Sequence, residues 1–527
     1  MKQIVALIFL SAASAALAAD LSPAARRWWS HVQFLADDRL EGRETGSPGH
    51  REAALYVARQ IAQAGLKPGG SKGYLQPVRF DVRRIDEDNS KLELIRDGKA
   101  EPVQFGKEAI LGLRIDPAPL VEGPLVFAAS ALVIPEKGIN DLAGLDLKGK
   151  IIVTIARVPQ GLTTEEMAFY GLRTSKALKE AGVIGRITIP SPKRSDIPWP
   201  RLARSRTLSS MSLTDLPPED GSSLGTSITF NPEAAERLFA GSGQTAAELI
   251  ALADQGRDLP RFPLKTAIRV KQSVVREQVE SQNVIGVVPG ADPKLKDEFV
   301  VFSAHLDHIG KSRVIEGDGI HNGAMDNASG IASLIEIARQ FAENSIQPRR
   351  SLAFVAVTGE EKGLLGSRYF VKRPTITGRM VANLNMDMFL PIHPLKVLTV
   401  LGLKESDLGP LMAESAAKFG VTVQPDPQPE RSAYTRSDQF NFTKIGVPSI
   451  NAKFGFEPDS TEQMIQKNWL TERYHAPSDD CAQPVDQEAA VLFNRILFDF
   501  AVKVANRDAR PQWAASSVFR KFEAQPQ

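Results

Sequence analysis

The sequence predicts an α/β protein in which a mixed, mostly parallel sheet is sandwiched between helices. Three short apolar runs bounded by polar residues have the pattern of strands buried on both faces, and they occupy 299–304, 352–357 and 381–386. Between the first two runs, residues 331–341 repeat apolar side chains at helical spacing. The pattern changes over 115–282, where short strands and helices alternate, and this indicates a small mixed α/β unit.

The first residues have the pattern of a signal peptide. Lys2 precedes an apolar run from Ile4 to Leu10, and small residues follow up to Ala19. The run is far shorter than the roughly 20 residues that a membrane span requires. We therefore assign residues 1–19 to a signal peptide and expect a periplasmic or secreted protein. No stable membrane anchor is expected, because no cysteine lies near the cleavage site to carry a lipid.

The composition is that of a globular protein. Hydrophobic residues make up 43% and charged residues 24% of the 527 residues, with 64 Lys and Arg against 62 Asp and Glu. This balance gives no argument for binding to nucleic acid or to an anionic membrane. Cys481 is the only cysteine, so no disulfide can form within the chain, and a catalytic thiol is not expected.

The pattern divides the chain into an N-terminal part, a small mixed unit and a large α/β domain. From Pro23 to Gly65 the apolar positions have helical spacing, and residues 74–85 are extended. A segment rich in proline and serine, 190–223, indicates long surface loops. The predicted parts are residues 20–114, 115–282 and 283–510, with a C-terminal tail at 511–527.

Polar motifs follow each of the three predicted strands. They are HLDH at 305–308, TGEE at 358–361 and Asp387, and two further motifs are GAMDNASG at 323–330 and YHAPSDD at 474–480. In open α/β sheets the ligand site gathers beyond the carboxyl ends of the strands. Histidine, aspartate and glutamate without a thiolate are the ligand set of a site that binds Zn²⁺ through nitrogen and oxygen.

The number of candidate ligands fits two metal ions better than one. Two ions about 3.5–4 Å apart need a bridging carboxylate, a role that suits Asp326 in the loop before the helix. Glu360 and Glu361 are adjacent, so one can bind a metal while the other takes a proton from the metal-bound water. Taken alone, such a pair is an ordinary solvated surface feature. Beside the other motifs it indicates hydrolysis.

At these motifs the sequence resembles the zinc exopeptidase family that contains bacterial leucyl aminopeptidases and glutamate carboxypeptidase. Residues 35–61, LADDRLEGRETGSPGHREAALYVARQI, resemble the opening of that family, and the likeness continues over 283–505. Residues 115–282 resemble the protease-associated domain that members often carry as an insertion, so the resemblance implies that 20–114 is the N-terminal part and 283–510 the main part of one larger catalytic domain. The resemblance implies the zinc exopeptidase fold, two Zn²⁺ ions and a peptide substrate.

The resemblance also implies a role for eight residues. Five are implied as metal ligands: His305 and Asp387 on one zinc, Glu361 and His475 on the other, and Asp326 as the bridge. Three are implied in catalysis: Glu360 as general base, Asp307 as the carboxylate that orients the His305 imidazole, and Tyr474 as hydrogen-bond donor to the tetrahedral intermediate.

Some of these residues have a simpler alternative role. Asp326 could cap the helix that follows it. Tyr474 could be a packed aromatic side chain with its hydroxyl in water. For Asp307 and Asp387 the alternative is a solvated carboxylate in a loop. In that case the metal centre would lack Asp387 as a ligand, and His305 would lack the carboxylate that orients it.

Other polar residues near the expected site receive no role in metal binding. We expect His308 and His321 to be structural or to contact the ligands rather than a metal. The motif SDQF at 437–440 resembles a family motif in which histidine stands at the position of Gln439, and this departure leaves Asp438 without an assigned role.

The implied function is that of an exported di-zinc aminopeptidase in which metal-activated water hydrolyses the N-terminal peptide bond. A carboxypeptidase or dipeptidase on the same metal core is the alternative among peptidases, because the residues that select a chain terminus are not identified. Related glutaminyl cyclases use one zinc, which the five candidate ligands disfavour. A receptor-like binding protein of the same fold would lack ligands, whereas all five are present. The sequence does not give the oligomeric state.

Overall fold

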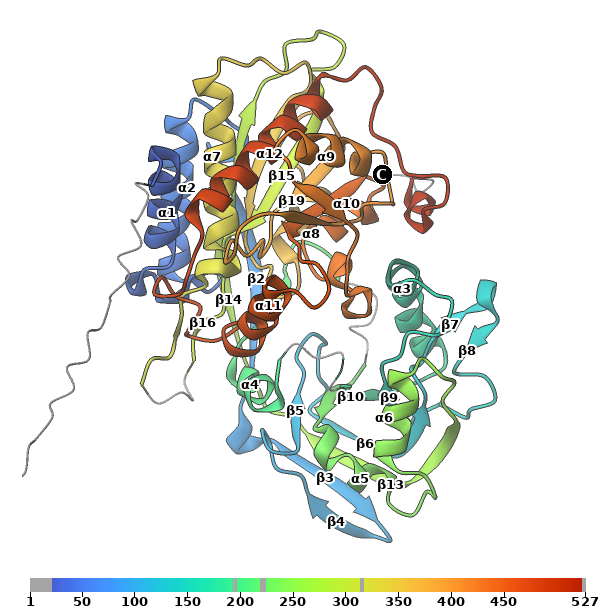
Figure 1. Cartoon of the computed structure of the whole chain (residues 1–527). Coiled ribbons are helices and arrows are strands. Elements are labelled where there is room, and N and C mark those ends of the chain that lie inside the picture. Colours follow the sequence, from blue (N-terminus) through green and yellow to red (C-terminus); the bar gives the residue numbers. More distant parts are fainter. Residues whose placement is uncertain (1–20, 192, 194–196, 219–223, 313–316, 524–527) are drawn as a thin grey trace, which may run out of the picture.

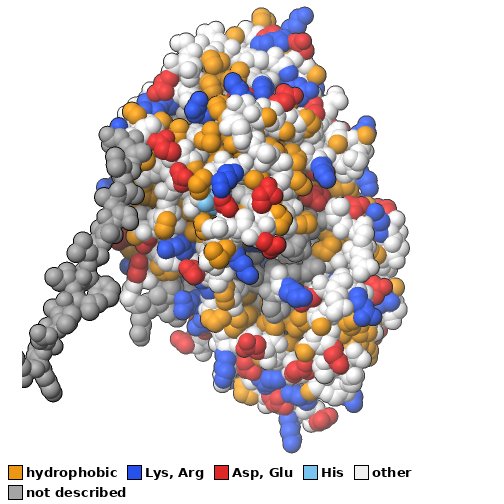
Figure 2. Space-filling model, in the orientation of Figure 1, with side chains coloured by type: hydrophobic (Ala, Val, Ile, Leu, Met, Phe, Trp, Pro, Cys, Tyr) orange, Lys and Arg blue, Asp and Glu red, His pale blue; other side chains and the backbone are white. Residues whose placement is uncertain are grey.

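The computed structural model describes residues 21–191, 193, 197–218, 224–312 and 317–523. The signal peptide expected at 1–19 lies outside these residues. Within them, no helix has the length and apolar character needed to cross a membrane. On the face shown in Figure 2, basic and acidic side chains are interspersed rather than gathered by sign.

The larger lobe is built on a ten-stranded mixed sheet (Figure 1). Its strands lie in the order β11 (Ser210–Leu213), β2 (Leu75–Ile85), β14 (Val274–Val288), β18 (Ser351–Val357), β15 (Glu298–His305), β19 (Arg379–Asn385), β22 (Ser449–Phe454), β20 (Val397–Leu401) and β21 (Thr422–Gln424), with β1 (Lys67–Pro68) also paired to β14. The four central strands, β18, β15, β19 and β22, are parallel, and the next pairs on both sides are antiparallel. The predicted mixed α/β fold is confirmed, with parallel pairing concentrated at the centre.

Helices cover both faces of this sheet. Val300 and Phe302 of β15 belong to one hydrophobic core, and Phe299 and Val301 belong to the core on the opposite face. Because successive side chains of a strand alternate between faces, a doubly covered strand needs apolar residues at nearly every position. The helices of the first core include α1 (Pro23–Leu35), α2 (Pro48–Gln63), α7 (Ser329–Glu343) and α12 (Gln487–Asn506), and those of the second are α8 (Leu365–Lys372) and α10 (Gln439–Lys444).

The two N-terminal helices begin at clear sequence signals. Ser22 accepts a hydrogen bond from the backbone N–H of Ala25, and Ser47 accepts one from His50, each at 3.1 Å. A proline follows each serine at the first helical position, where no backbone donor is lost. These caps fix where α1 and α2 start on the large sheet.

The smaller lobe has a sheet and a hydrophobic core of its own. Its strands lie in the order β4 (Lys99–Pro102), β3 (Lys91–Arg96), β13 (Arg261–Lys271), β6 (Leu120–Ala128), β9 (Ile151–Ile155), β10 (Gly185–Ile189), β12 (Thr226–Phe230) and β5 (Ala109–Leu111). These strands come from residues 91–271, which begin earlier than the expected insertion, and β11 at 210–213 joins the large sheet instead. The identity of this lobe as a protease-associated domain stays a prediction, as do the domain boundaries.

The last described residues of the chain contact both lobes. A short 3-10 helix, Val518–Phe522, places Phe522 with its ring centroid 5.0 Å from that of Phe169, which lies on α3 (Thr164–Glu180) of the smaller lobe. Phe519 is fully buried and stacks on Tyr434 of the larger lobe at 5.2 Å. The described part of the predicted tail is therefore packed against both lobes.

Candidate metal centre

The parallel strands bring the predicted site residues to one edge of the large sheet. β15 ends at His305, and the loops after β18 and β19 carry Glu361 and Asp387. Parallel neighbours point their carboxyl ends the same way, so these loops meet although they lie far apart in the sequence. Two further segments, which contain Asp326 and His475, complete the group.

Asp326 lies between two histidines. Its Oδ1 is 3.2 Å from Nε2 of His305, and its Oδ2 is 3.3 Å from Nε2 of His475. Nε2 of His305 is also 3.2 Å from Oδ1 of Asp387, and Nε2 of His475 is 3.3 Å from Oε2 of Glu361. The five predicted ligands thus form two groups that share one carboxylate, which is the arrangement that a bridged pair of metal ions requires.

The loop that carries Asp326 is held by hydrogen bonds to its backbone. The carboxylate of Asp479 accepts from the N–H groups of Met325 and Asp326 at 2.9 and 3.0 Å. The alternative role of Asp326 as a helix cap is taken by its neighbour, because Oδ1 of Asn327 accepts from the N–H of Gly330 at 3.1 Å. The side chain of Asp326 is therefore left to face the histidines.

His308 is a candidate ligand that the sequence analysis did not assign. Its Nδ1 lies 2.8 Å from Oε1 of Glu361 and 3.8 Å from Oδ2 of Asp326, and the ring is fully buried. Among the described residues, neither this Nδ1 nor this Oε1 has a hydrogen-bond partner of good geometry. Its position in HLDH, three residues after His305, was the available signal. His321 is farther away, with its ring centroid 6.5 Å from that of His308.

The chemistry of these donors fits divalent metal ions. Asp326 and Asp387 are buried, Glu361 is nearly so, and all three lie against imidazole nitrogens. Burying several carboxylates together is costly unless positive charge compensates them. The groups His305, Asp326, Asp387 and His308, Asp326, Glu361 each offer three ligand atoms within 4.8 Å of one another. Nitrogen and oxygen ligands of this kind suit Zn²⁺.

Asp307 acts differently from the expectation. Nδ1 of His305 is 3.0 Å from the backbone carbonyl of Asp307, not from its carboxylate. The carboxylate instead accepts from the backbone N–H groups of Glu360 and Glu361 at 3.1 and 3.3 Å, and from the hydroxyl of Thr45 at 3.0 Å. Because the backbone carbonyl of Asp307 already contacts the His305 imidazole, the buried carboxylate of Asp307 is available to fix the turn that contains Glu360 and Glu361.

The two adjacent glutamates differ in their electrostatics. Burial, reinforced by Asp387 and Glu361, raises the pKa of Glu360 well above its ordinary value despite the opposing effect of His305. Burial would also raise the pKa of Glu361, but His475 and His308 outweigh it and hold that pKa well below the ordinary range. Neighbouring carboxylates with opposite shifts can take different roles, one as a ligand and one as a proton carrier.

Tyr474 and Asp438 lie beside the ligands. Burial raises the pKa of Tyr474 well above its ordinary value, so its hydroxyl stays protonated, and its ring centroid is 4.0 Å from that of His475. Asp438 is fully buried, and burial raises its pKa to about 7. Gln439, at the position where the family motif has histidine, accepts from Asn385 at 2.8 Å and donates to the carbonyl of Tyr434 at 2.5 Å.

Arg43 ties the ligand loops to the N-terminal segment. It is 1% exposed and donates to the carbonyl oxygens of Leu306, Asn322 and Gly323 at 3.0, 2.6 and 3.1 Å. Leu306 follows His305, and the other two residues precede Asp326. Arg43 belongs to the EGRETGS stretch, but the sequence alone gave no signal that its partners would be backbone carbonyls.

Comparison with known proteins agrees with this geometry. Residues 283–501 match the model of peptidase family M28. The chain is 32% identical over 134 residues to aminopeptidase NAALADL1 of Mus musculus, covering 24% of this chain and 16% of that protein. It is 28% identical over 187 residues to leupeptin-inactivating enzyme 1 of Streptomyces exfoliatus, covering 35% of this chain and 38% of that protein. These matches therefore span well under two thirds of the relatives' length.

A solved structure shows the same fold over nearly the whole chain. The aminopeptidase from Aneurinibacillus sp. strain AM-1 aligns with a TM-score of 0.55 and 19% identity, covering 92% of this chain and 95% of that one. All five predicted ligands lie within 283–501. The resemblance to zinc exopeptidases is confirmed, and it rests on the match of residues 283–501 to peptidase family M28.

Proposed function

We propose that the protein is an exported di-zinc aminopeptidase that removes N-terminal residues from peptides. The observation that carries this proposal is the position of Asp326, whose two carboxylate oxygens face His305 and His475 separately. The match to peptidase family M28 supports peptide hydrolysis, and the name of one relative supports the aminopeptidase reaction. Export rests on the sequence pattern of residues 1–19 alone.

The predicted ligands would hold the two zinc ions in two groups. His305, Asp326 and Asp387 would hold one zinc, and Asp326, Glu361 and His475 the other. When bound, the ions polarise the scissile carbonyl and lower the pKa of a water molecule.

Two residues beside the ligands then act on the substrate. Glu360 takes a proton from the attacking water and delivers it to the leaving amine, a task that suits a carboxylate with a raised pKa. Tyr474 donates a hydrogen bond to the carbonyl oxygen as negative charge develops there.

Metal removal tests this function directly. We expect purified protein to contain about two zinc ions per chain and to lose aminopeptidase activity on treatment with a chelator. Addition of Zn²⁺ should restore the activity, measured with a panel of aminoacyl chromogenic substrates. Full activity in protein shown to be metal-free, or no bound metal after purification in zinc, would contradict the proposal.

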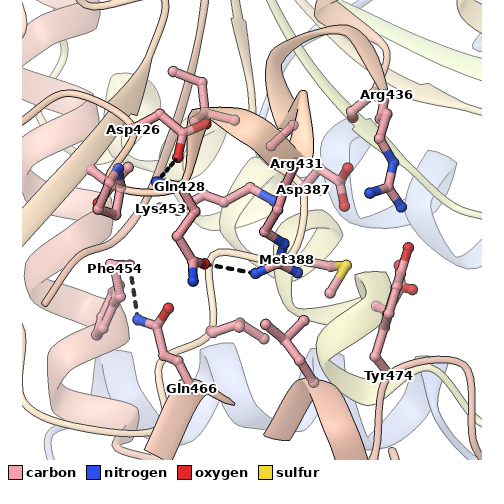
Figure 3. A pocket seen from close by; sticks show the side chains of 18 of the residues that line it. Asp387, Met388, Asp426, Gln428, Arg431, Arg436, Lys453, Phe454, Gln466 and Tyr474 are labelled. Carbon is pink, nitrogen blue, oxygen red and sulfur yellow. Dashed lines mark hydrogen bonds between the residues drawn. The ribbon is translucent and has the colours of Figure 1, made fainter. Parts of the chain in front are cut away.

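A second candidate function, that of a dipeptidase, is favoured by the pocket beside the centre. The pocket has a volume of about 140 Å³ and contains His305, Glu360 and Asp387 in its wall. Figure 3 shows Arg431, Arg436 and Lys453 around it. A free carboxylate one residue beyond the scissile bond would be attracted by these cations, whereas an ammonium group would be repelled.

Lys453 is the cation of this pocket that acts most directly on the centre. It lies on β22 and extends toward Asp387 in Figure 3. Burial alone would raise the pKa of Asp387, but the charge of Lys453 and the contact with His305 lower it. Among the described residues, no carboxylate lies within ion-pair distance of Lys453. Arg431 is held by Gln428, to whose Oε1 it donates at 2.7 Å, and Asp426 is a carboxylate in the same wall.

The preference for a free carboxylate can be measured with matched substrates. For a dipeptide and its C-terminal amide, we expect the free acid to have the higher kcat/KM. Lys453→Met should reduce this ratio by about tenfold, the effect of losing roughly 1.4 kcal/mol. Lys467→Met, an exposed lysine on α11 (Thr461–Glu472), is the control. Equal rates for acid and amide, with zinc content intact, would remove the dipeptidase candidate and leave the aminopeptidase proposal standing.

A further inference from the structure

His475 is the least supported of the predicted ligands. The side chain of His305 is 1% exposed, and its Nδ1 contacts a backbone carbonyl at 3.0 Å. The side chain of His475 is 22% exposed, and its contacts with Asp326 and Glu361 are both made by Nε2. Histidines that bind metals are usually oriented through their second ring nitrogen. The orientation of His475 therefore depends on its ring contact with Tyr474 and on how its backbone is held.

That backbone is held by Arg201, which lies within the predicted segment 115–282. The guanidinium donates to the carbonyl oxygen of Tyr474 at 2.7 Å and to that of Thr471 at 2.6 Å, with a longer contact of 3.5 Å to Leu470. The carbonyl of Tyr474 belongs to the peptide group that leads directly into His475. His475 itself has a φ of 55°, in the left-handed region that residues other than glycine adopt infrequently.

The same contacts satisfy the end of helix α11. The last carbonyl groups of a helix have no partner within the helix and carry partial negative charge, which a cation stabilises. Arg201 covers Leu470 and Thr471, while the hydroxyl of Ser478 donates to Glu472 at 3.0 Å. Arg201 thus fixes both the end of α11 and the peptide group between Tyr474 and His475.

Arg201 is itself anchored to the smaller lobe. It lies on the short helix α4 (Trp199–Arg204), within the proline-rich segment that the sequence predicts to be surface loops. Two residues earlier, the indole N–H of Trp199 is 3.1 Å from the carbonyl oxygens of Gly106 and Lys107, next to strand β5 of the smaller sheet. Helix α4 therefore links the smaller lobe to the loop that carries one predicted ligand, and the residues that follow it lead into β11 of the large sheet.

We propose that Arg201 is a positioning residue that sets the affinity of the metal site containing His475, so that the smaller lobe controls how that site is filled. The site containing His305 and Asp387 receives its support from β15, β19 and Arg43, and it does not depend on α4. The proposal rests on the proposed di-zinc centre. It predicts that loss of Arg201 lowers the metal affinity of the site containing His475 and leaves that of the site containing His305 and Asp387 unchanged.

Equilibrium metal titration of the full chain tests this inference. Metal-free protein is titrated with Zn²⁺ against a chromophoric chelator, and with Co²⁺ followed by its visible absorption. For Arg201→Ala we expect one of the two binding steps to weaken about 10- to 100-fold, as for other residues that support metal ligands, while the other step is unchanged. Arg201→Lys keeps the charge but loses the paired donors, so the metal affinity of its weakened step should lie between those of Arg201→Ala and the parent protein.

Arg204→Ala is the matched control, because Arg204 is an exposed arginine on the same helix. It should bind both metals like the parent protein. Two unchanged steps in Arg201→Ala would overturn the inference while leaving the di-zinc proposal intact. Equal weakening of both steps, together with a lower thermal unfolding temperature of the metal-free protein, would also overturn it, because that result indicates general destabilisation. A parent protein that binds no metal would overturn both proposals.

Discussion

Glu360→Gln is expected to lower kcat by about 10²- to 10⁴-fold while both metal ions stay bound. The substitution keeps the size of the side chain and removes its ability to accept and release a proton. Glu360 is not among the predicted ligands, and its backbone N–H would still donate to Asp307, so the turn with Glu361 keeps its shape. Steady-state kinetics and zinc analysis of the same preparation measure the two quantities together.

The neighbouring residue provides the control for this prediction. Glu361→Gln makes the same change one position later, but it removes a carboxylate that lies 3.3 Å from His475 and 2.8 Å from His308. We expect that variant to lose zinc, whereas Glu360→Gln does not. A Glu360→Gln enzyme with near-normal turnover would exclude Glu360 as the general base, and loss of zinc from it would show that Glu360 is a ligand.

Asp326→Ala is expected to remove both metal ions and all measurable activity. Its two oxygens face the two histidines, so a single substitution takes one ligand from each site. Asp387→Ala should instead weaken only the site of His305, because Asp387 contacts no other predicted ligand histidine. Zinc content after dialysis distinguishes the two variants, and retention of one tightly bound zinc in Asp326→Ala would contradict the bridging role.

The stability of the metal-free protein separates loss of metal from misfolding in Asp326→Ala. The Asp326 loop is fixed by Asp479 through backbone groups, and Asn327 caps the start of α7. In the metal-free protein, contacts with the histidines outweigh burial and the charge of Glu361 and hold the pKa of Asp326 below its ordinary value, so its charge contributes to stability near neutral pH. We therefore expect the thermal unfolding temperature of the metal-free variant to be slightly lower than that of the metal-free parent. A marked decrease would mean that Asp326 supports the fold itself.

Much of the centre could be predicted because each ligand follows a strong local pattern. His305, Glu361 and Asp387 come directly after buried apolar strands, and the parallel order of β18, β15 and β19 brings their loops together. The sequence alone thus indicated the edge of the sheet where the ligands meet. It could not give the tilt of each side chain, and for that reason His308 was not assigned and Asp307 was given a contact that its backbone carbonyl makes instead.

The contacts that could not be predicted join distant segments through backbone groups. Arg201 and Arg43 donate to carbonyl oxygens of residues far along the chain, and a carbonyl oxygen carries no signature in the amino-acid type. The pairing of β11 with β2 is similar, because its four residues lie in a segment rich in proline and serine and have too short a pattern to show which sheet they join. Local periodicity predicts elements, but it does not give their long-range partners.

The position of Arg43 has a consequence for how the active molecule is assembled. During synthesis, Arg43 is added some 260 residues before the loops whose carbonyl oxygens the Arg43 side chain binds. These loops can adopt their final shape only after the early helical segment has docked, so the ability to hold cations arises late in folding. An excised fragment 283–501 would keep every predicted ligand in its sequence but would lack Arg43 and its hydrogen bonds to the ligand loops.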